Sequence, residues 1–574
     1  MNIFKKYLEK IIEIIIKNSK ELDIDNNFKN ESVTIEIPPV EFNFDLSCNI
    51  AMILGKKNKK NPKDLAVKIK KILLKNCKDF SSIETAGPGF LNIKLGNNVL
   101  QNIIVNICKT SSEYGSNYKN KKYNIEFVSA NPTGPMHVGH CRGAVFGDVL
   151  SNLLKFNGNK VVKEYYINDY GNQIKNFTES VFLRLKEIKK KEKFQNKENL
   201  YPGEYIIDIA NKILKKKQNI NLDNFDKIYE YLKKESLKHS MDLIKSDLKQ
   251  LGIEHDEFVS ESNLIQNNLV ETTVKNLKKN KFVEEGFLPP PKGEEIKDWK
   301  KVKRLIFKST LFGDDVDRAL QKNDGSWTYF ASDLAYHAYK VSRNFEFLID
   351  VLGADHTGYI KRISAAVNAL SNNKVTLNCK VCQLVKLYKK GKPFKMSKRS
   401  GDFISVSDLL REVNKDSIRF MMLNRSHDME LDFDFDKILE KSKDNPVFYV
   451  QYCYARINSL FRSLNKDLNS EVEFDVNNLE FNDFENKILR KIFEWPKIVE
   501  TASNKYEPHR IPFYLYDLAN LFHSYWSEGN KNEKYRFLIN GKIKNKNTLL
   551  VIKTLAIVIE NGMKILGVSL PKKM

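Results

Sequence analysis

The chain has 574 residues, too many for one hydrophobic core, so roughly three or four domains are expected. Lysine and arginine number 95 against 72 acidic residues, a net charge of +23 that suits a polyanionic partner such as RNA. Much of this excess lies in lysine-rich stretches without a motif, so charge alone is weak support. Seven cysteines in this length exclude a disulfide scaffold, and no apolar run reaches the ~20 residues of a transmembrane helix.

The amino-terminal part, residues 1–115, predicts a separate α+β domain. Apolar residues recur at helical spacing over Met1–Lys20 with lysines between them, which is typical of a surface helix and not of an export signal. Alternation over Ser32–Pro38 predicts a strand, and a lysine-rich helix follows over Pro62–Asn76. A turn within Glu84–Lys94 then leads into another strand. With no export signal and no membrane span, we expect a soluble, cytoplasmic protein.

The most informative stretch of the chain is Ile125–Asp148. It begins within an apolar, β-rich run, Tyr123–Val128. The chain then turns through Asn131–Pro135, where residues that break regular structure are clustered. From Val138 onward the apolar residues recur at helical spacing. The sequence therefore predicts a strand, a tight turn and a helix.

Two histidines, His137 and His140, fall on the first turn of this helix, with Gly139 between them. A helix start offers unpaired N–H groups and a positive dipole end, which favour phosphate. Two imidazoles three residues apart can both donate hydrogen bonds to phosphate oxygens, and Gly139 leaves space for a flat ring against the backbone. One interpretation is a nucleotide site; the other is a turn whose histidines only cap a helix.

The central part, residues 116–435, predicts an α/β doubly wound, Rossmann-like domain. Its polar turn at Asn168–Gln173 follows a strand, where open α/β sheets bind ligands. Residues 182–300 are rich in lysine and glutamate and predict a helical insertion, either a solvated surface or an RNA contact. The predicted strands after the first are Asn159–Ile167, Arg304–Lys308, a run from Trp327 that becomes helical near Ser332, Phe347–Leu352 and Cys379–Leu387.

From about Asp436 to Met574 the pattern is helical throughout. Two segments, Val447–Phe461 and Tyr514–Trp526, carry apolar and aromatic faces. Such faces usually form a core, and the alternative is that some of the tyrosines stack on RNA bases. The pair Cys379 and Cys382 lacks a second pair of ligands at zinc-site spacing, so we expect two reduced thiols on a strand and no structural metal.

A second motif lies far from the histidines, at Lys392–Gly401, with the sequence Lys-Pro-Phe-Lys-Met-Ser-Lys-Arg-Ser-Gly. Together with His137-Val-Gly-His140, in this order, it resembles the two signature motifs of class I aminoacyl-tRNA synthetases. The neighbouring residues resemble the arginyl-tRNA synthetases in particular. The matching stretches are Glu126 with Ser129–His140, Tyr165–Ile174, Phe312–Arg318 and Gly353–Tyr359.

This resemblance implies a ligase that uses ATP, with Mg²⁺ accompanying the ATP, to join arginine to tRNA. It implies an α+β amino-terminal domain that touches the tRNA, an all-α anticodon-binding domain over residues 436–574, and a monomer. The residues implied in catalysis are His137, His140, Lys395 and Lys398, and those implied in ATP binding also include Gly139, Met396 and Ser397.

The resemblance also implies residues that select arginine. A guanidinium needs planar, charged acceptors, which carboxylates provide. We expect Asp333 on the guanidinium and Glu126 with Asn131 nearer the α-amino group, and the resemblance adds Tyr329 and His356. The alternatives are a class I synthetase for another amino acid, a nucleotidyltransferase with similar histidines and a non-catalytic RNA-binding relative.

Overall fold

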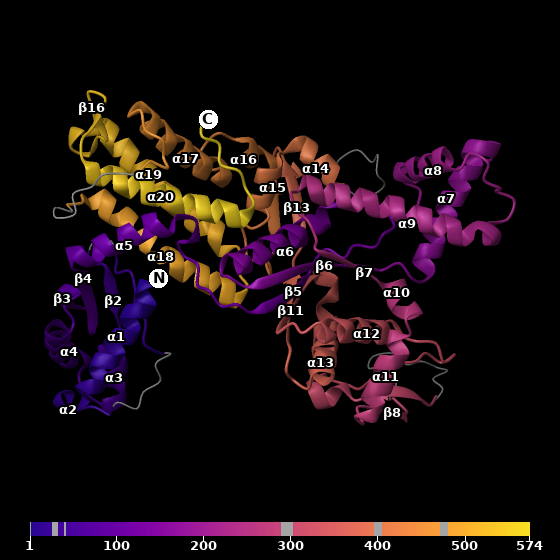
Figure 1. The fold of residues 1–574 in the computed structure, drawn as a ribbon, viewed down its shortest axis with the longest axis horizontal. Helices are drawn as coiled ribbons and strands as arrows, with labels where there is room; N and C mark the ends of the chain where they lie inside the picture. Colours follow the sequence, from indigo (N-terminus) through magenta and orange to yellow (C-terminus); the bar gives the residue numbers. More distant parts are fainter. Residues whose placement is uncertain (1, 26–31, 40–41, 289–301, 395–403, 471–479) are drawn as a thin grey trace. The chain divides into compact units, whose positions relative to one another are not determined.

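The computed structural model describes residues 2–25, 32–39, 42–288, 302–394, 404–470 and 480–574 (Figure 1). The chain forms two compact units. One contains residues 118–440 and 507–509, and the other contains residues 1–117, 441–506 and 510–574.

The first of these units is built on a five-stranded sheet with the order β12-β11-β5-β6-β7. All four strand pairs are parallel. The chain adds β6 and β7 on one side of β5 and then returns to add β11 and β12 on the other, so the switch point lies between β5 and β11. This arrangement confirms the predicted doubly wound, Rossmann-like fold. The strands are β5 (Lys122–Glu126), β6 (Lys160–Ile167), β7 (Glu257–Ser260), β11 (Phe347–Gly353) and β12 (Thr376–Cys382).

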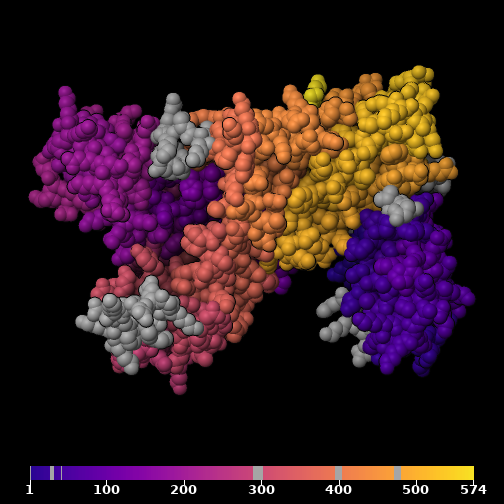
Figure 2. All heavy atoms as spheres, turned by 180° about the vertical axis from the view of Figure 1, so that it is seen from behind, coloured from indigo at the N-terminus to yellow at the C-terminus, as the bar shows by residue number. Residues whose placement is uncertain are grey.

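Helices connect these parallel strands. α6 leads from β5 to β6, and α7, α8 and α9 lie between β6 and β7. Figure 2 shows α7–α9, in purple, as a lobe of this unit separate from the pink lobe that follows β7 in the chain. The helices are α6 (Val138–Phe156), α7 (Asn172–Lys190), α8 (Glu204–Lys216), α9 (Phe225–Gln250), α10 (Glu261–Gln266), α11 (Leu269–Lys279), α12 (Tyr329–Ser342) and α13 (Ile360–Ser371).

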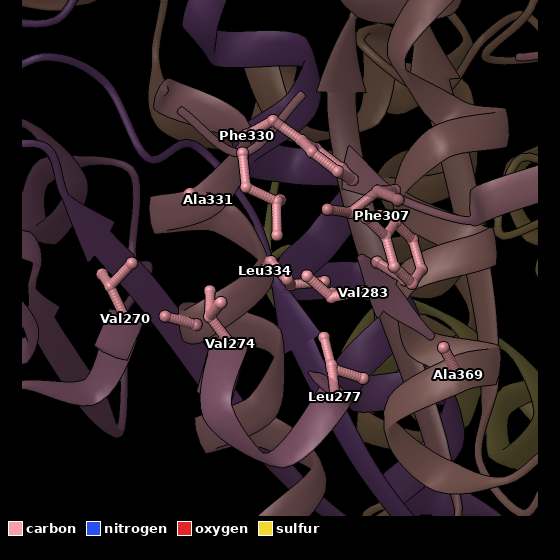
Figure 3. Close-up of a cluster of buried hydrophobic side chains, with 13 residues drawn as sticks. Val270, Val274, Leu277, Val283, Phe307, Phe330, Ala331, Leu334 and Ala369 are labelled. Atoms are coloured by element: carbon pink, nitrogen blue, oxygen red, sulfur yellow. The ribbon is translucent and has the colours of Figure 1, made fainter. Parts of the chain in front are cut away.

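A small antiparallel sheet with the order β10-β9-β8 supports α12. Phe307 of this sheet packs with Val274 of α11, with Phe330 and Leu334 of α12 and with Ala369 of α13 in one buried cluster (Figure 3). The cluster fixes the helix that carries Asp333. The strands are β8 (Val283–Gly286), β9 (Arg304–Phe307) and β10 (Arg318–Ala319).

Three sequence predictions in this unit need correction. The segment 182–300 is not wholly helical, because β7 joins the edge of the parallel sheet beside β6 and β8 joins β9. The strand at Arg304 belongs to the antiparallel sheet and not to the parallel one. The run from Trp327 forms only an isolated bridge, because the hydroxyl of Thr328 accepts the N–H of Ala331 at 3.3 Å and starts α12 at Tyr329.

The predicted strand Cys379–Leu387 is also wrong, since it is two strands in different sheets. β12 ends at Cys382, and β13 begins at Val385 in a sheet with the order β14-β13-β15. Between them the N–H of Gln383 donates to the carbonyl of His427 at 2.8 Å, which turns the chain away from the parallel sheet. The remaining elements are β13 (Val385–Lys389), β14 (Lys392–Pro393), α14 (Val406–Glu412), α15 (Lys415–Met421), β15 (Leu431–Asp434) and α16 (Phe435–Leu439).

The second unit combines the amino-terminal α+β module with the carboxyl-terminal helices. Trp495 donates a hydrogen bond to the carbonyl of Tyr114 at 2.8 Å, and Arg490 pairs with Asp45 at 3.2 Å. The module has an antiparallel sheet with the order β1-β2-β4-β3. Its elements are α1 (Ile3–Lys17), α2 (Ser19–Leu22), β1 (Ile35–Glu36), β2 (Leu46–Cys48), α3 (Ile50–Asn58), α4 (Pro62–Asn76), β3 (Phe80–Ala86), β4 (Phe90–Leu95) and α5 (Asn97–Thr110).

The carboxyl-terminal part of this unit is helical, as predicted, apart from a short hairpin of β16 and β17. The last helix, α20 (Lys546–Leu566), is buried along most of its length and forms the centre of the helical domain. Among the described residues, no helix combines the length and the apolar character needed to span a membrane. The elements are α17 (Pro446–Ser463), α18 (Asp483–Lys505), α19 (Arg510–Lys531), β16 (Leu538–Ile539), β17 (Lys542–Ile543) and α20 (Lys546–Leu566).

Candidate active site

The turn after β5 is strained and closely held by β6. Val128 and Ser129 both have positive φ, 71° and 39°, a conformation that non-glycine residues adopt uncommonly and β-branched residues such as valine very rarely. The Ser129 hydroxyl donates to Glu126 at 2.9 Å and accepts the N–H of Tyr166 at 3.0 Å. The hydroxyl of Tyr165 donates to the carbonyl of Ala130 at 2.7 Å. These contacts fix Glu126, the last residue of β5, at the carboxyl edge of the sheet.

The two predicted histidines lie together at the start of α6. The Nδ1 of His137 accepts the backbone N–H of Gly139 at 3.1 Å and so caps the helix. The Nδ1 of His140 accepts the backbone N–H of His137 at 3.3 Å, and the two rings stack with centroids 3.8 Å apart. Because each Nδ1 is an acceptor, the proton of each neutral ring is assigned to Nε2.

Both imidazoles are neutral donors at physiological pH. Burial lowers the pKa of His137, and burial together with the nearby His137 lowers the pKa of His140 to about 3. Neutral Nε2–H groups at the positive end of the helix dipole suit an anion such as phosphate. The ring that lies over Gly139 is the imidazole of His137, since a Cβ at this glycine would be 2.8 Å from its Cε1.

A buried lysine, Lys340 of α12, joins the end of β5 to the middle of β11. Its Nζ pairs with Glu126 and, at 2.8 Å, with Asp350. The Nε2 of His337 lies 3.0 Å from the other oxygen of Asp350. Burial opposes the charge of Lys340, but Asp350 and Glu126 outweigh burial and raise its pKa. Burial also disfavours the Asp350 carboxylate, yet Lys340 and His337 lower its pKa overall. Lys340 thus orients Glu126 and stays charged.

Four carboxylates form an acidic cluster around the half-buried Tyr166: Glu126, Asp169, Glu261 and Asp333. Burial raises the pKa of Tyr166, and these four negative charges raise it further. Glu261 is 5% exposed, and within the described part of the chain no group donates a hydrogen bond to its carboxylate. Burial, followed by Asp333 and Asp169, raises the pKa of Glu261 to about 7. Such a cluster at the carboxyl edge of a parallel sheet suits a cationic ligand.

The structure brings Asp333 into this cluster but not Tyr329 or His356. Burial raises the pKa of Asp333, and the Tyr359 hydroxyl, which donates to its carboxylate, partly offsets the effect. Tyr329 is 72% exposed, with Lys322 over its ring. His356 pairs with its exposed neighbour Asp355 at 3.4 Å.

The remaining predicted residues are Asn131 and those of the lysine motif. Asn131 is exposed, donates to Gln173 at 3.1 Å and accepts from Asn168 at 3.4 Å. It therefore contacts the polar turn that follows β6. The predicted residues Lys395, Met396, Ser397 and Lys398 lie outside the described residues.

Sequence reasoning missed Glu261, Tyr359 and Lys340. Glu261 was hidden in the segment predicted as a helical insertion, although it directly follows the edge strand β7. An assignment of Glu257–Ser260 as a sheet strand would have placed it at the ligand-binding edge. For Lys340 the signal was helical spacing, because it lies seven residues, about two turns, after Asp333 and so on the same face of α12.

Three family models match consecutive parts of the chain. They are described as the arginyl tRNA synthetase N terminal domain, over residues 2–95, the catalytic domain of class I (R) tRNA synthetases, over residues 100–459, and the DALR anticodon binding domain, over residues 450–574. An arginine–tRNA ligase of Pelagibacter ubique is 52% identical over 579 residues, which cover 100% of both chains. The chain belongs to the arginyl-tRNA synthetases.

Other arginyl-tRNA synthetases agree with this assignment. An arginine–tRNA ligase of Bartonella bacilliformis is 43% identical over 592 residues, again 100% of both chains. The solved structure of the Thermus thermophilus arginyl-tRNA synthetase has a TM-score of 0.71 at 18% identity, over 99% of this chain and 100% of that one, and shows the same fold. The family inferred from the two motifs, and the three kinds of domain expected with it, are confirmed.

Proposed function

We propose that the acidic cluster binds arginine and the start of α6 binds ATP, so that the protein joins arginine to tRNA in two steps. In the first, the carboxylate of arginine attacks the α-phosphate of ATP, forming arginyl-adenylate and releasing pyrophosphate. In the second, the arginyl group passes to the terminal adenosine of the tRNA and AMP leaves. Since the substrate supplies the nucleophile, the protein needs only to align the reactants and stabilise charge. The acidic cluster at the carboxyl edge of the sheet, together with two neutral histidine donors at the start of the helix after β5, is the observation that carries this proposal.

In this proposal different carboxylates bind the two ends of arginine. Asp333, oriented by the Tyr359 hydroxyl, and Glu261, to which no described residue donates, receive the guanidinium through charged hydrogen bonds. Glu126, held by Lys340, and Asn131 lie nearer the α-ammonium. Tyr329 and His356, both exposed, are assigned to the solvent side of the bound substrate.

The nucleotide is assigned to the other motif. His137 and His140 donate through Nε2 to the phosphates, and Gly139 leaves the space that the His137 ring needs to reach them. From the sequence motif, Lys395 and Lys398 neutralise the departing pyrophosphate, with Met396 and Ser397 also at the ATP. Among the described residues there is no group of three or more His, Cys, Asp or Glu side chains that could hold a metal. We therefore infer that Mg²⁺ enters bound to ATP, and no step is derived through it.

The remaining division of labour follows the family. We propose that residues 116–435, with the insertion at about 182–300, carry out the chemistry. Residues 1–115 and 436–574 hold the tRNA. The functional form is a cytoplasmic monomer.

A substrate panel tests the proposal. Pyrophosphate exchange, with arginine tRNA present, is measured with arginine, lysine and citrulline, which has the shape of arginine without its charge. Arginine alone should support rapid exchange. Citrulline leaves the buried carboxylates without a cationic partner, and lysine offers a single ammonium in place of the planar guanidinium that can pair with two carboxylates. Equal exchange with citrulline would remove the acidic cluster from the arginine site. Exchange with a different amino acid would reassign the substrate.

A further inference from the structure

The segment at the start of α6 and the segment at the start of α14 are joined by backbone pairing. An antiparallel bridge links His137, at the start of α6, to Ser405, at the start of α14. Beside it, the N–H of Val138 donates to the carbonyl of Ile404 at 2.9 Å, and the N–H of Val406 donates back to the first segment at 3.0 Å. Ile404 follows closely, in sequence, the motif that contains the two predicted catalytic lysines. This pairing therefore connects the histidine motif to the segment that follows the lysine motif in sequence.

A buried carboxylate from a third element, Asp247 of α9, fastens this pairing. Asp247 is 4% exposed. Its Oδ2 accepts the backbone N–H of Met136 at 3.0 Å, and its Oδ1 accepts the hydroxyl of Ser407 at 3.1 Å. One oxygen thus holds the segment before the histidines and the other holds the segment after the lysine motif.

We propose that Asp247 is a positioning residue for arginine activation, which sets the histidine motif and the segment after the lysine motif in the register that the reaction needs. It does not touch the substrates, so its effect passes through His137 and through the chain at Ser405. The inference rests on the proposed roles of the two motifs. Because small displacements of reacting groups slow catalysis strongly, loosening this joint should lower kcat more than it weakens arginine binding.

The charge state of Asp247 gives the joint a dependence on pH. Burial raises the pKa of Asp247 to about 6, although the N–H of Met136 and the hydroxyl of Ser407 oppose this, and Asp408 of α14 adds to it. Cys141 of α6 also faces Asp247, and burial together with Asp247 raises the pKa of this thiol to about 12, so it stays uncharged at neutral pH. Below pH 6 Asp247 gains a proton and holds both donors less strongly, so kcat should fall there.

Four variants test the role of Asp247: Asp247→Ala, Asp247→Asn, Ser407→Ala and, as a control, Asp256→Asn. Asp256 also accepts a backbone N–H, that of Lys163 at 2.8 Å, but lies on the surface. For each, kcat and KM for arginine are measured by pyrophosphate exchange from pH 5.5 to 8.5, beside the melting temperature. Asp247→Ala should lower kcat about tenfold to a hundredfold with KM for arginine within about twofold.

The other variants define the mechanism. Asp247→Asn, which still accepts from Met136 and can donate to Ser407, should keep most of kcat at pH 7.5 and lose the decline below pH 6. The kcat of Ser407→Ala should lie between those of Asp247→Ala and Asp247→Asn. The kcat of Asp256→Asn should match that of the unmodified protein.

Several results would overturn the role given to Asp247. They are an unchanged kcat in Asp247→Ala, a loss that only follows the folded fraction, or an acid decline that persists in Asp247→Asn. If Asp247→Ala does not fold, the pH profile of Asp247→Asn and the kcat of Ser407→Ala decide. His140→Ala separates the two proposals: if it leaves kcat intact, the proposed ATP site is wrong, whatever Asp247 does.

Discussion

Asp333 tests the choice of substrate at the level of a single residue. Asp333→Asn keeps the shape of the side chain and removes its charge, so the fold should survive while kcat/KM for arginine falls by the equivalent of about 2–5 kcal/mol, the range for one side of a buried charge pair. The Tyr359 hydroxyl can still donate to the amide oxygen, which limits the structural loss. Steady-state kinetics at pH 8 measure the change. An unchanged kcat/KM would remove Asp333 from the guanidinium site.

Glu261 predicts a pH dependence of arginine binding. Its pKa is raised to about 7, so the carboxylate becomes protonated as the pH falls below 7 and KM for arginine should rise. Glu261→Gln should have a high KM at pH 8 and little pH dependence. Kinetics at fixed ionic strength from pH 6 to 8.5 compare the two proteins. A wild-type KM that is flat over this range would contradict the assignment.

The same residue predicts a stability effect with a definite sign. The folded protein without arginine holds the Glu261 proton up to about pH 7, whereas an unfolded carboxyl releases it near its ordinary pKa of about 4.5. Between these values the folded state binds more protons, so the free energy of unfolding should fall as the pH rises. Glu261→Gln should remove this decline in urea unfolding. Saturating arginine should reduce it in the unmodified protein, because a bound cation favours the carboxylate.

At this scale the sequence identified residues where a motif fixed the neighbourhood and missed those brought in by topology. His137, Gly139 and His140 lie next to one another because all three are at the start of one helix. Glu261 reaches Asp333 only through the pairing of β6 with β7, and no local pattern shows that pairing. The resemblance suggested Asp333, Tyr329 and His356 together. Asp333 accepts the hydroxyl of Tyr359, which lies three residues after His356 in sequence, whereas Tyr329 and His356 are exposed.

At the scale of elements, the lysine motif is expected to act in the chemical step. Lys398→Ala should lower kcat for arginine activation far more than it raises KM for arginine, because the lysine charge is most valuable as pyrophosphate departs. Lys392→Ala, in the same motif but on β14, is the matched control and should change little. Single-turnover adenylate formation separates the chemical step from product release. If only KM for arginine rose, the motif would be a binding element.

Helices and strands were predictable from the sequence where the hydrophobic periodicity and the capping residues indicate the same element. α4 was predicted with its actual bounds, because Asn61 caps it and Pro62 begins it. The run from Trp327 was predicted as a strand because aromatic residues favour strands. The Thr328 cap and the cluster around Leu334 favour the helix that forms instead. Sheet membership was the least predictable property, since β9 has the composition of a core strand and only its partners show which sheet it joins.

For the whole molecule, the helical domain and the amino-terminal module share one compact unit. The Trp495 indole reaches Tyr114, and Asn561 of α20 also donates to the carbonyl of Tyr114, at 3.2 Å. Deleting residues 436–574 would therefore remove part of the support of the amino-terminal module. Loss of tRNA binding in such a truncation would not separate a binding role from unfolding. Single surface substitutions are the informative test.

Tyr452 of α17 is the best residue at which to test whether the helical domain binds tRNA. Arg456 lies over its ring at 4.3 Å and over the ring of Trp526 at 5.2 Å, an aromatic and cationic arrangement suited to stacking on RNA bases. Tyr452→Ala should weaken tRNA binding by about 1–3 kcal/mol, the range for one stacked base. It should also reduce the preference for arginine tRNA over other tRNAs.

Salt titrations and a matched aromatic control complete this experiment. Tyr452→Ala removes no charge, so the slope of log affinity against log salt should not change. Arg456→Gln should flatten it by about 0.7–0.9 if the arginine also meets a phosphate. Phe90→Ala, on the exposed side of β4 in the amino-terminal module, should leave the preference among tRNAs unchanged. If Phe90→Ala abolished that preference while Tyr452→Ala did not, anticodon recognition would belong to the amino-terminal module, and the helical domain would serve to brace the structure.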